Sequence, residues 1–159
     1  MSAAVEFERC DAGVLGELEP LWLTLKNHHG ACTPDDAIHD DATSWERRKV
    51  QYADWLALDG SFLLVARDAG HPVGYALVWI HEGSPTWVEP DRYAVVQDIA
   101  VAADQQGKGV GRELLDRVHD ESGCDVVELT VLSVNEPARR FYERIGFELY
   151  TESLRRRRQ

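Results

Sequence analysis

Apolar positions in the first part of the chain repeat at helical spacing. A short alternating segment over Val5–Cys10 indicates an edge strand. Asp11 then stands where a helix N-cap would lie, and leucines recur every three or four residues through segment 14–29. Pro20 lies inside that segment, so we expect the helix to be kinked or broken there.

A second helix is predicted over residues 44–59. Ser44 is its expected cap, and its apolar positions include two tryptophans that we expect to be buried. The residues between the two helices, 30–43, are polar and indicate a loop. The first sixty residues therefore predict one edge strand followed by two helices.

From residue 61 onward the pattern becomes that of a sheet. Turn-forming residues over 67–72 join two apolar runs and predict a hairpin. Two further helices are indicated, one beginning near Val110 and one over 135–146 that Gly146 closes. The predicted strands are 61–66, 73–80, 93–102, 125–132 and 147–154. Helices interleaved with strands of mixed connection predict an α/β or α+β sheet covered by helices, with a right-handed crossover between strands 93–102 and 125–132.

The segment Asp104–Gly111, DQQGKGVG, has three glycines in five residues between a strand and a helix. The first N–H groups of a helix have no intrahelical partner, so such a turn can hold an anion, and glycine lets the backbone approach it closely. Lys108 and Arg112 add positive charge. The spacing differs from that of a P-loop, because Gly109 follows Lys108, and from that of a dinucleotide fingerprint.

Two segments in order resemble the GNAT acetyltransferase superfamily. In the first, Gln106, Gly109 and Gly111 take the fixed places of a Gln-x-x-Gly-x-Gly turn. The second has Asn135, then Tyr142, then Gly146-Phe147. The resemblance covers residues 93–149 and implies a single domain over 1–154, with an arginine-rich tail at 155–159. It also implies a mixed, mostly antiparallel central sheet of about six to seven strands flanked by helices.

The resemblance further implies transfer of an acetyl group from acetyl-CoA, as a co-substrate, to a primary amine in a ternary complex, with no metal. Backbone groups of a strand would pair with the pantetheine arm, N–H groups of the glycine turn would hold the pyrophosphate, and Tyr142 would protonate the departing thiolate. The implied cofactor-binding residues are Ile99, Ala100, Val101, Gln106, Gly107, Lys108, Gly109, Val110, Gly111, Arg112, Asn135 and Tyr142.

An amine must lose a proton before it attacks a thioester, and the sequence leaves the acceptor of that proton open. Glu82 and Asp98 are candidate catalytic carboxylates, and His81 is a third candidate, all near strand ends. An ordered water is a further alternative. Asn135 also suits the N-cap of a helix that has Pro137 in its first turn.

The net charge of −11 arises entirely within residues 1–104. Segment 27–41 holds three histidines, one cysteine and four aspartates, but its adjacent pairs cannot readily converge on one metal ion. A solvated acidic loop is the simpler interpretation. The alternative is a surface that attracts a cationic acceptor, formed by Asp35, Asp36, Asp40 and Asp41.

The remaining features set the expected context. An acidic chain does not favour nucleic acid, and without a long apolar run or a hydrophobic leader we expect neither a membrane span nor export, hence a cytoplasmic protein. Three widely spaced cysteines indicate reduced thiols. Arg155–Arg158 are expected to form a disordered tail, with RNA or the extra phosphate of CoA as alternative contacts. The family resemblance favours a homodimer, and a catalytically inactive acyl-CoA-binding module remains the alternative function.

Overall fold

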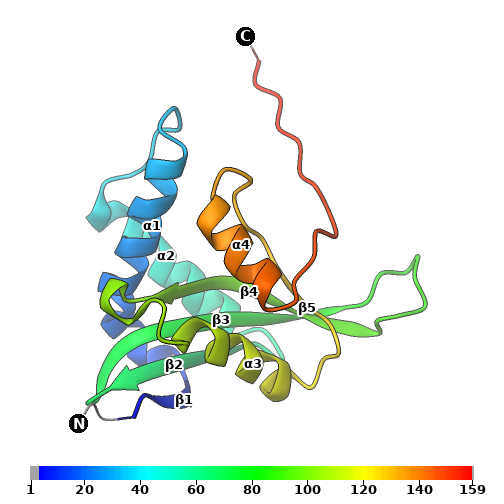
Figure 1. Cartoon of the computed structure of the whole chain (residues 1–159), viewed down its shortest axis with the longest axis horizontal. Helices are drawn as coiled ribbons and strands as arrows, with labels where there is room; N and C mark the ends of the chain where they lie inside the picture. The colour runs from blue at the N-terminus through cyan, green and yellow to red at the C-terminus, as the bar shows by residue number, and fades with distance from the viewer. Residues whose placement is uncertain (1–3, 159) are drawn as a thin grey trace.

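A computed structural model describes residues 4–158, and a five-stranded sheet forms the centre of this part of the chain. Figure 1 shows the sheet between two helical layers. Its strands are β1 (Glu6–Cys10), β2 (Phe62–Asp68), β3 (His71–Glu82), β4 (Arg92–Val101) and β5 (Val127–Leu129). The helices are α1 (Glu19–Cys32), α2 (Asp41–Leu56), α3 (Val110–Ser122) and α4 (Glu136–Arg144), with short 3-10 helices η1 (Ala12–Leu18) and η2 (Ala103–Gln105).

The strands follow one another across the sheet in the order β1-β2-β3-β4-β5. The first four are antiparallel neighbours, whereas β5 is parallel to β4, as the intervening helix α3 requires. The predicted hairpin is formed by β2 and β3, and the prediction of a mixed, mostly antiparallel sheet flanked by helices is confirmed. No helix within residues 4–158 is long and apolar enough to cross a lipid bilayer.

Alternation along the central strands builds a core on each face of the sheet. Ala76 and Val78 of β3 pack with Leu114 of α3 on one side, where α4 also lies. Tyr75 and Leu77 point to the other side, where α1 and α2 cover the sheet. Because successive side chains of a strand face opposite ways, β3 and β4 contribute to both cores.

Local capping explains where the helices begin. Asp11 accepts a hydrogen bond from the N–H of Gly13 at 2.7 Å and caps η1. The predicted break near Pro20 is confirmed, because η1 ends at Leu18 and α1 begins at Glu19. The prediction of Ser44 as a cap is wrong. Asp40 caps α2 by accepting from the N–H of Thr43 at 3.0 Å, so the helix starts three residues earlier.

The C-terminal region departs most from the sequence pattern. The predicted strand over 147–154 is absent from the described residues, and the strand predicted over 125–132 is reduced to the three residues of β5. The sheet of residues 4–158 therefore has five strands, where six to seven were expected. A strand needs a partner, and beyond Gly146 the chain leaves the sheet (Figure 1) with Leu149 and Tyr150 about 70% exposed.

A buried chain of hydroxyl groups joins α2 to the sheet. The Tyr52 hydroxyl of α2 donates to Asp98 Oδ2 of β4 at 2.6 Å and lies 2.8 Å from the Tyr75 hydroxyl of β3, which must therefore act as donor to Tyr52. Both tyrosines are fully buried. Burial raises the pKa of the Asp98 carboxyl, while the nearby Arg48 guanidinium and the Tyr52 hydrogen bond oppose that rise.

Tyr52→Phe should lower the free energy of unfolding by about 1–3 kcal/mol, because Tyr75 loses its acceptor and Asp98 loses a donor. Removing that donor also raises the pKa of Asp98 further. A carboxyl with a raised folded-state pKa contributes its full stability below the unfolded pKa of about 3.9 and loses it as pH rises through the folded pKa. The loss of unfolding free energy caused by Tyr52→Phe should therefore be larger near pH 7 than near pH 4.

Urea unfolding at the two pH values measures this difference. Tyr150→Phe is the matched control, because Tyr150 is 70% exposed and its substitution should cost less than about 0.5 kcal/mol at either pH. Equal losses for the two variants, or a deficit that does not grow with pH, would contradict the assigned hydrogen bonds.

Candidate active site

Strand β4 is paired along its whole length on one side only. β3 pairs with it from Arg92 to Val101, whereas β5 pairs only with Ala94, Val95 and Val96. Within the described residues, no strand pairs with the β5-facing edge of segment 97–101. This edge therefore presents backbone groups that can pair with an extended ligand.

A bulge marks the point at which β4 and β5 separate. The register passes from Leu77–Asp98 to Val78–Val96, so Gln97 is an extra residue in β4. The bulge resets the alternation of β4, and Asp98 consequently shares the face of Leu77 and Tyr75, under α1 and α2. The same strand thus presents a free edge from residue 97 onward and a carboxylate toward the helices.

The glycine turn follows this edge directly. Gly107 and Gly109 have φ of 77° and 91°, a region that only glycine adopts readily, and a Cβ at either position would meet nothing within 4 Å. Among the described residues, the N–H groups of Gly107, Gly109 and the first turn of α3 (110–112) donate to no backbone or side-chain acceptor. The turn therefore presents a ring of unpaired N–H donors at the N-terminus of α3, which is the positive end of the helix dipole.

Charged and polar side chains surround that ring. Lys108 is exposed, and Arg112 makes only a long 3.7 Å ion pair with Asp116, so both can turn toward an anion. Gln106 Nε2 donates to the carbonyl of Val101 at 3.2 Å and ties the turn to the end of β4. Its backbone N–H donates to the carbonyl of Ala102 at 3.1 Å, so both donors of Gln106 have internal partners and its predicted contact with the pyrophosphate stays a prediction.

Helix α4 packs against the start of α3. A Cβ at Gly111 would lie 3.4 Å from Phe141 Cζ, so the absent side chain lets the two helices approach. Tyr142 is half-buried beside Phe147, with their ring centroids 5.8 Å apart, and its hydroxyl has no hydrogen-bond partner within residues 4–158. Burial raises the pKa of Tyr142, so the phenol keeps its proton at neutral pH.

Asn135 begins α4, as predicted. Its side-chain oxygen accepts from the N–H of Ala138 at 3.4 Å, and only 5% of the residue is exposed. The N-cap prediction is confirmed. The predicted contact with the cofactor arm stays a prediction, for which the amide nitrogen of Asn135 is the remaining donor.

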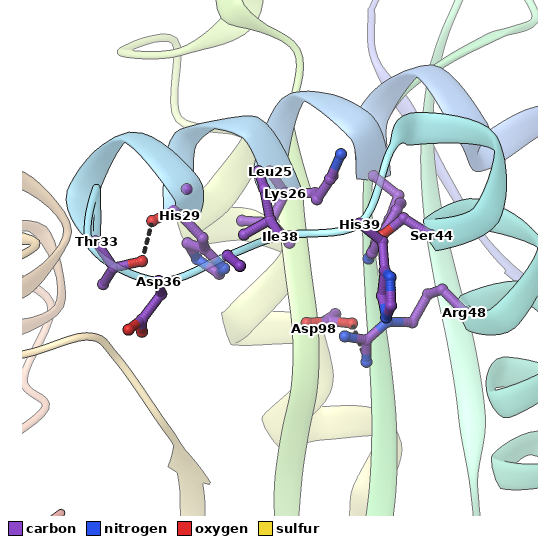
Figure 2. A pocket seen from close by; sticks show the side chains of 13 residues that line it. Leu25, Lys26, His29, Thr33, Asp36, Ile38, His39, Ser44, Arg48 and Asp98 are labelled. Atoms are coloured by element: carbon purple, nitrogen blue, oxygen red, sulfur yellow. Dashed lines mark hydrogen bonds and ion pairs between the residues drawn. The ribbon is translucent and has the colours of Figure 1, made fainter. Parts of the chain in front are cut away.

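A cavity of about 340 Å³ lies between α1, α2 and the 33–40 segment, with Asp98 at its floor. Figure 2 shows Arg48 reaching down from α2 to Asp98, and His29 of α1 pointing into the same space. The Arg48 Nη1–Asp98 Oδ2 distance is 3.3 Å, and the guanidinium stacks on Trp22 at 5.5 Å. Because Asp98 immediately precedes segment 99–101, the cavity adjoins the strand edge on which the cofactor arm is predicted to lie.

Glu82 and His81 lie away from this cavity. Leu77, opposite Asp98, precedes Glu82 by five residues, which is roughly 16 Å along β3. Glu82 is exposed, and His81 stacks on Tyr93 with ring centroids 5.3 Å apart. Of the three residues predicted to take the amine proton, the structure brings only Asp98 to the cavity, and the choice among them stays a prediction.

The acidic segment is largely occupied by its own contacts. Asp40 caps α2, and Asp41 accepts from Lys26 Nζ at 2.7 Å. Asp36 pairs with Arg155 at 3.2 Å and also with Arg157, so the C-terminal arginines contact the rim of the cavity. Asp35 alone of these four aspartates has no such contact within the described residues. No group of three or more His, Cys, Asp or Glu side chains in residues 4–158 could hold a metal ion.

Sequence reasoning missed Arg48, Tyr52 and His29 as parts of this site. A signal for the first two was present: Trp45, Arg48, Tyr52 and Trp55 follow one stripe of α2, so Arg48 is a charge among buried aromatic residues. An arginine in such a stripe requires a buried partner, and Asp98 is that partner. His29 carried no comparable signal, because the sequence does not show which face of α1 meets the cavity.

Comparison with known proteins agrees with this geometry. The profile of the acetyltransferase (GNAT) family matches residues 22–147. The chain is 35% identical over 136 residues to a mycothiol acetyltransferase of Propionibacterium freudenreichii subsp. shermanii, a match that covers 80% of this chain and 38% of that protein. It therefore spans well under half the length of that relative.

A shorter relative is matched over most of its length. The chain is 37% identical over 106 residues to the 5-NmdU N-acetyltransferase of Pseudomonas phage PaMx11, covering 67% of this chain and 71% of the relative. Among solved structures, the aminoglycoside N-acetyltransferase AAC(6')-Iy in complex with CoA superposes with a TM-score of 0.72 at 15% identity, covering 100% of this chain and 97% of that one. This similarity confirms the fold. With a family match over most of the chain, this protein belongs to the acetyltransferase (GNAT) family.

Proposed function

We propose that the chain is an N-acetyltransferase that transfers the acetyl group of acetyl-CoA, the co-substrate that its family uses, to a primary amine within a ternary complex. One observation carries the proposal: β4 provides a free backbone edge that leads into a ring of unpaired N–H donors, and the same strand carries Asp98 at the floor of a cavity. A cofactor site and an acceptor site would thus meet at one point.

The residues present fit the cofactor. The pyrophosphate would accept hydrogen bonds from the N–H groups of Gly107, Gly109 and segment 110–112, in the open space left by the two glycines, and Lys108 and Arg112 would add side-chain charge. The pantetheine arm would pair with backbone groups of segment 99–101, where Gln106 already occupies one carbonyl. When bound, acetyl-CoA supplies an acetyl group activated as a thioester.

The remaining work of the enzyme is positioning and proton transfer. Tyr142 is the proposed acid, because its protonated hydroxyl has no hydrogen-bond partner within residues 4–158 and α4 holds it on the sheet face that carries the glycine turn. The amine would enter through the cavity and meet the thioester beside Asp98. Direct attack needs no covalent enzyme intermediate, and Cys124, which follows the C-cap of α3, is buried and only 3% exposed.

The acceptor is proposed to be the amine of a small molecule or of a peptide. Relatives with this fold include proteins named for L-amino acids, for 5-NmdU and for aminoglycosides, so the scaffold suits several acceptors. The walls of the cavity carry Lys26, Arg48 and two histidines beside Asp36 and Asp98. With most of the nearby aspartates already paired, we favour an acceptor that combines an amine with a neutral or anionic polar group over a simple polyamine; an anionic group would compete with Asp41 and Asp98 for Lys26 and Arg48.

Release of free thiol from acetyl-CoA across a panel of amines tests the function. We expect turnover with at least one acceptor among amino acids, peptides, aminoglycosides and polyamines, and a preference for acceptors that are not polycations. The affinity for acetyl-CoA is measured separately. Tight binding with no thiol release from any amine would contradict the transferase and would favour an inactive acyl-CoA-binding module.

Gly109→Glu should abolish acetyl-CoA binding. The side chain would force a non-glycine residue into the left-handed region, and its carboxylate would repel the pyrophosphate from the start of α3. Isothermal titration calorimetry should show at least a hundredfold weaker affinity, which corresponds to about 2.7 kcal/mol. Gly123→Glu is the matched control, since Gly123 is also left-handed but lies at the other end of α3, roughly 20 Å away. Comparable losses in both variants would refute the phosphate assignment.

Tyr142→Phe should lower turnover by about 10²-fold and leave the affinity for acetyl-CoA nearly unchanged, because it removes a proton donor and keeps the packing against Phe147. Steady-state kinetics with the best acceptor of the panel measures the effect. Tyr150→Phe, an exposed position on the same C-terminal region, should retain the wild-type rate. A variant at position 142 that is as fast as the wild type would remove Tyr142 from the chemistry.

A further inference from the structure

His29 is the cavity-lining ionisable group that the fold itself leaves uncommitted. Within residues 4–158 its ring nitrogens have no hydrogen-bond partner, although the residue is only partly exposed. Its backbone carbonyl accepts from Thr33, which fixes the end of α1 and therefore the position of the ring. Figure 2 shows the ring directed into the cavity above Asp98.

Every other charged group or histidine on the cavity wall already has a partner. The pairs are Lys26 with Asp41, His39 with Arg47 at 3.2 Å, Arg48 with Asp98, and Asp36 with Arg155 and Arg157. A proton acceptor must have a free lone pair, and Asp98 Oδ1 has one as well as His29. His29 differs in that its ring makes no polar contact within residues 4–158, whereas the charge of Asp98 is already paired with Arg48.

We propose that His29 is the general base that takes the proton from the bound acceptor ammonium, directly or through one water. This assignment rests on the proposed transferase function and names the base of that same site. It differs from the carboxylates expected from the sequence, because the ring comes from α1, whereas Asp98 and Glu82 come from the sheet.

The proton balance of the step is complete. The ammonium gives one proton to the neutral imidazole, and the amine nitrogen then forms a bond to the thioester carbonyl carbon as the C–S bond breaks. The nitrogen loses a second proton on the way to the amide, and the thiolate gains one from Tyr142. The second proton from the nitrogen, carried through water, restores the one that Tyr142 gave up. One ammonium and one thioester thus yield an amide, a thiol and one proton, which His29 passes to solvent.

The surroundings of His29 suit this task. Burial lowers its pKa, as do the adjacent His28 on α1 and Arg48 on α2, so the ring is neutral at physiological pH. Asp98 on β4 acts in the opposite direction and would stabilise the imidazolium once it forms. Lys26, Asp36 and His39, which also face the cavity, are balanced by their own partners.

Asp98 is accordingly a positioning residue. Its Oδ2 atom is held by Tyr52 and by Arg48, and a proton taken up at the other oxygen would remove the negative charge that pairs with Arg48. A carboxylate held in this way fixes Arg48 and supplies negative charge to the cavity that His29 also lines, which favours a histidine base.

His29→Gln tests the assignment in the full-length protein with the fastest acceptor of the amine panel. We expect kcat to fall by about 10²-fold with acetyl-CoA affinity unchanged. The low-pH limb of the kcat/KM profile should disappear, because that limb reports the ionisation of the base. His28→Gln is the matched control: it lies next in sequence, is exposed and is not among the residues that line the cavity. It should retain the rate and the limb, with the limb moved slightly to higher pH because His28 no longer lowers the pKa of His29.

The outcomes separate the inference from the function on which it rests. An active wild type whose His29→Gln variant keeps the wild-type limb and rate would overturn the role of His29 and leave the transferase standing. A wild type that binds acetyl-CoA but acetylates no amine would overturn both. NMR titration of the wild-type ring gives a result that does not depend on the folding of a variant: a pKa below about 6.5 is expected, and a ring protonated at neutral pH would overturn the proposal.

Discussion

The hydrogen bond between Tyr52 and Asp98 is the constraint on which the site depends. A carboxylate beneath two helices is costly to bury, and it is tolerated here because two donors meet at one of its oxygens. Burial also raises the pKa of Tyr52, so the phenol remains a donor. This bond holds α2 at a fixed height above β4, and the cavity is the space that remains between α2, α1 and the strand. Arg48 is fixed in the same way, between Asp98 and the rings of Trp22 and Trp55.

Strand β4 both orients Asp98 toward the cavity and provides an unpaired backbone edge. Its bulge at Gln97 turns Asp98 toward the helices, and from the same point β5 no longer pairs with it. An unpaired strand edge is usually a liability in a protein, since it invites another chain. Here the edge leads into the free N–H donors of Gly107, Gly109 and segment 110–112, so its unpaired groups have a proposed partner in a ligand that is extended at one end and anionic at the other.

The parts of the site that the sequence predicted are those fixed by local geometry. A turn that needs left-handed residues requires glycine, and a helix start needs a short polar cap, so Gly109 and Asn135 could be recognised from their neighbours in the chain. The Tyr52–Asp98 contact joins residues 46 positions apart and depends on how α2 lies on the sheet, which no local pattern specifies. The same reasoning explains the missing strand over 147–154, since alternation shows that a segment can be a strand but not that an edge is available to pair with it.

The charge of the chain also has a different meaning once the fold is known. The sequence offered four aspartates near the acceptor site as a surface for cations, yet three of them have partners, and two arginines from the C-terminus lie on Asp36 at the cavity rim. Exposed ion pairs are weak and are screened by salt, so these arginines can give way to an entering molecule without a large loss. On the proposed function, the acceptor is selected inside the cavity, where Lys26 and Arg48 are paired with Asp41 and Asp98 and an anionic group would compete with these carboxylates. The net negative charge of the molecule therefore describes its outer surface and says little about the sign of the group that the site prefers.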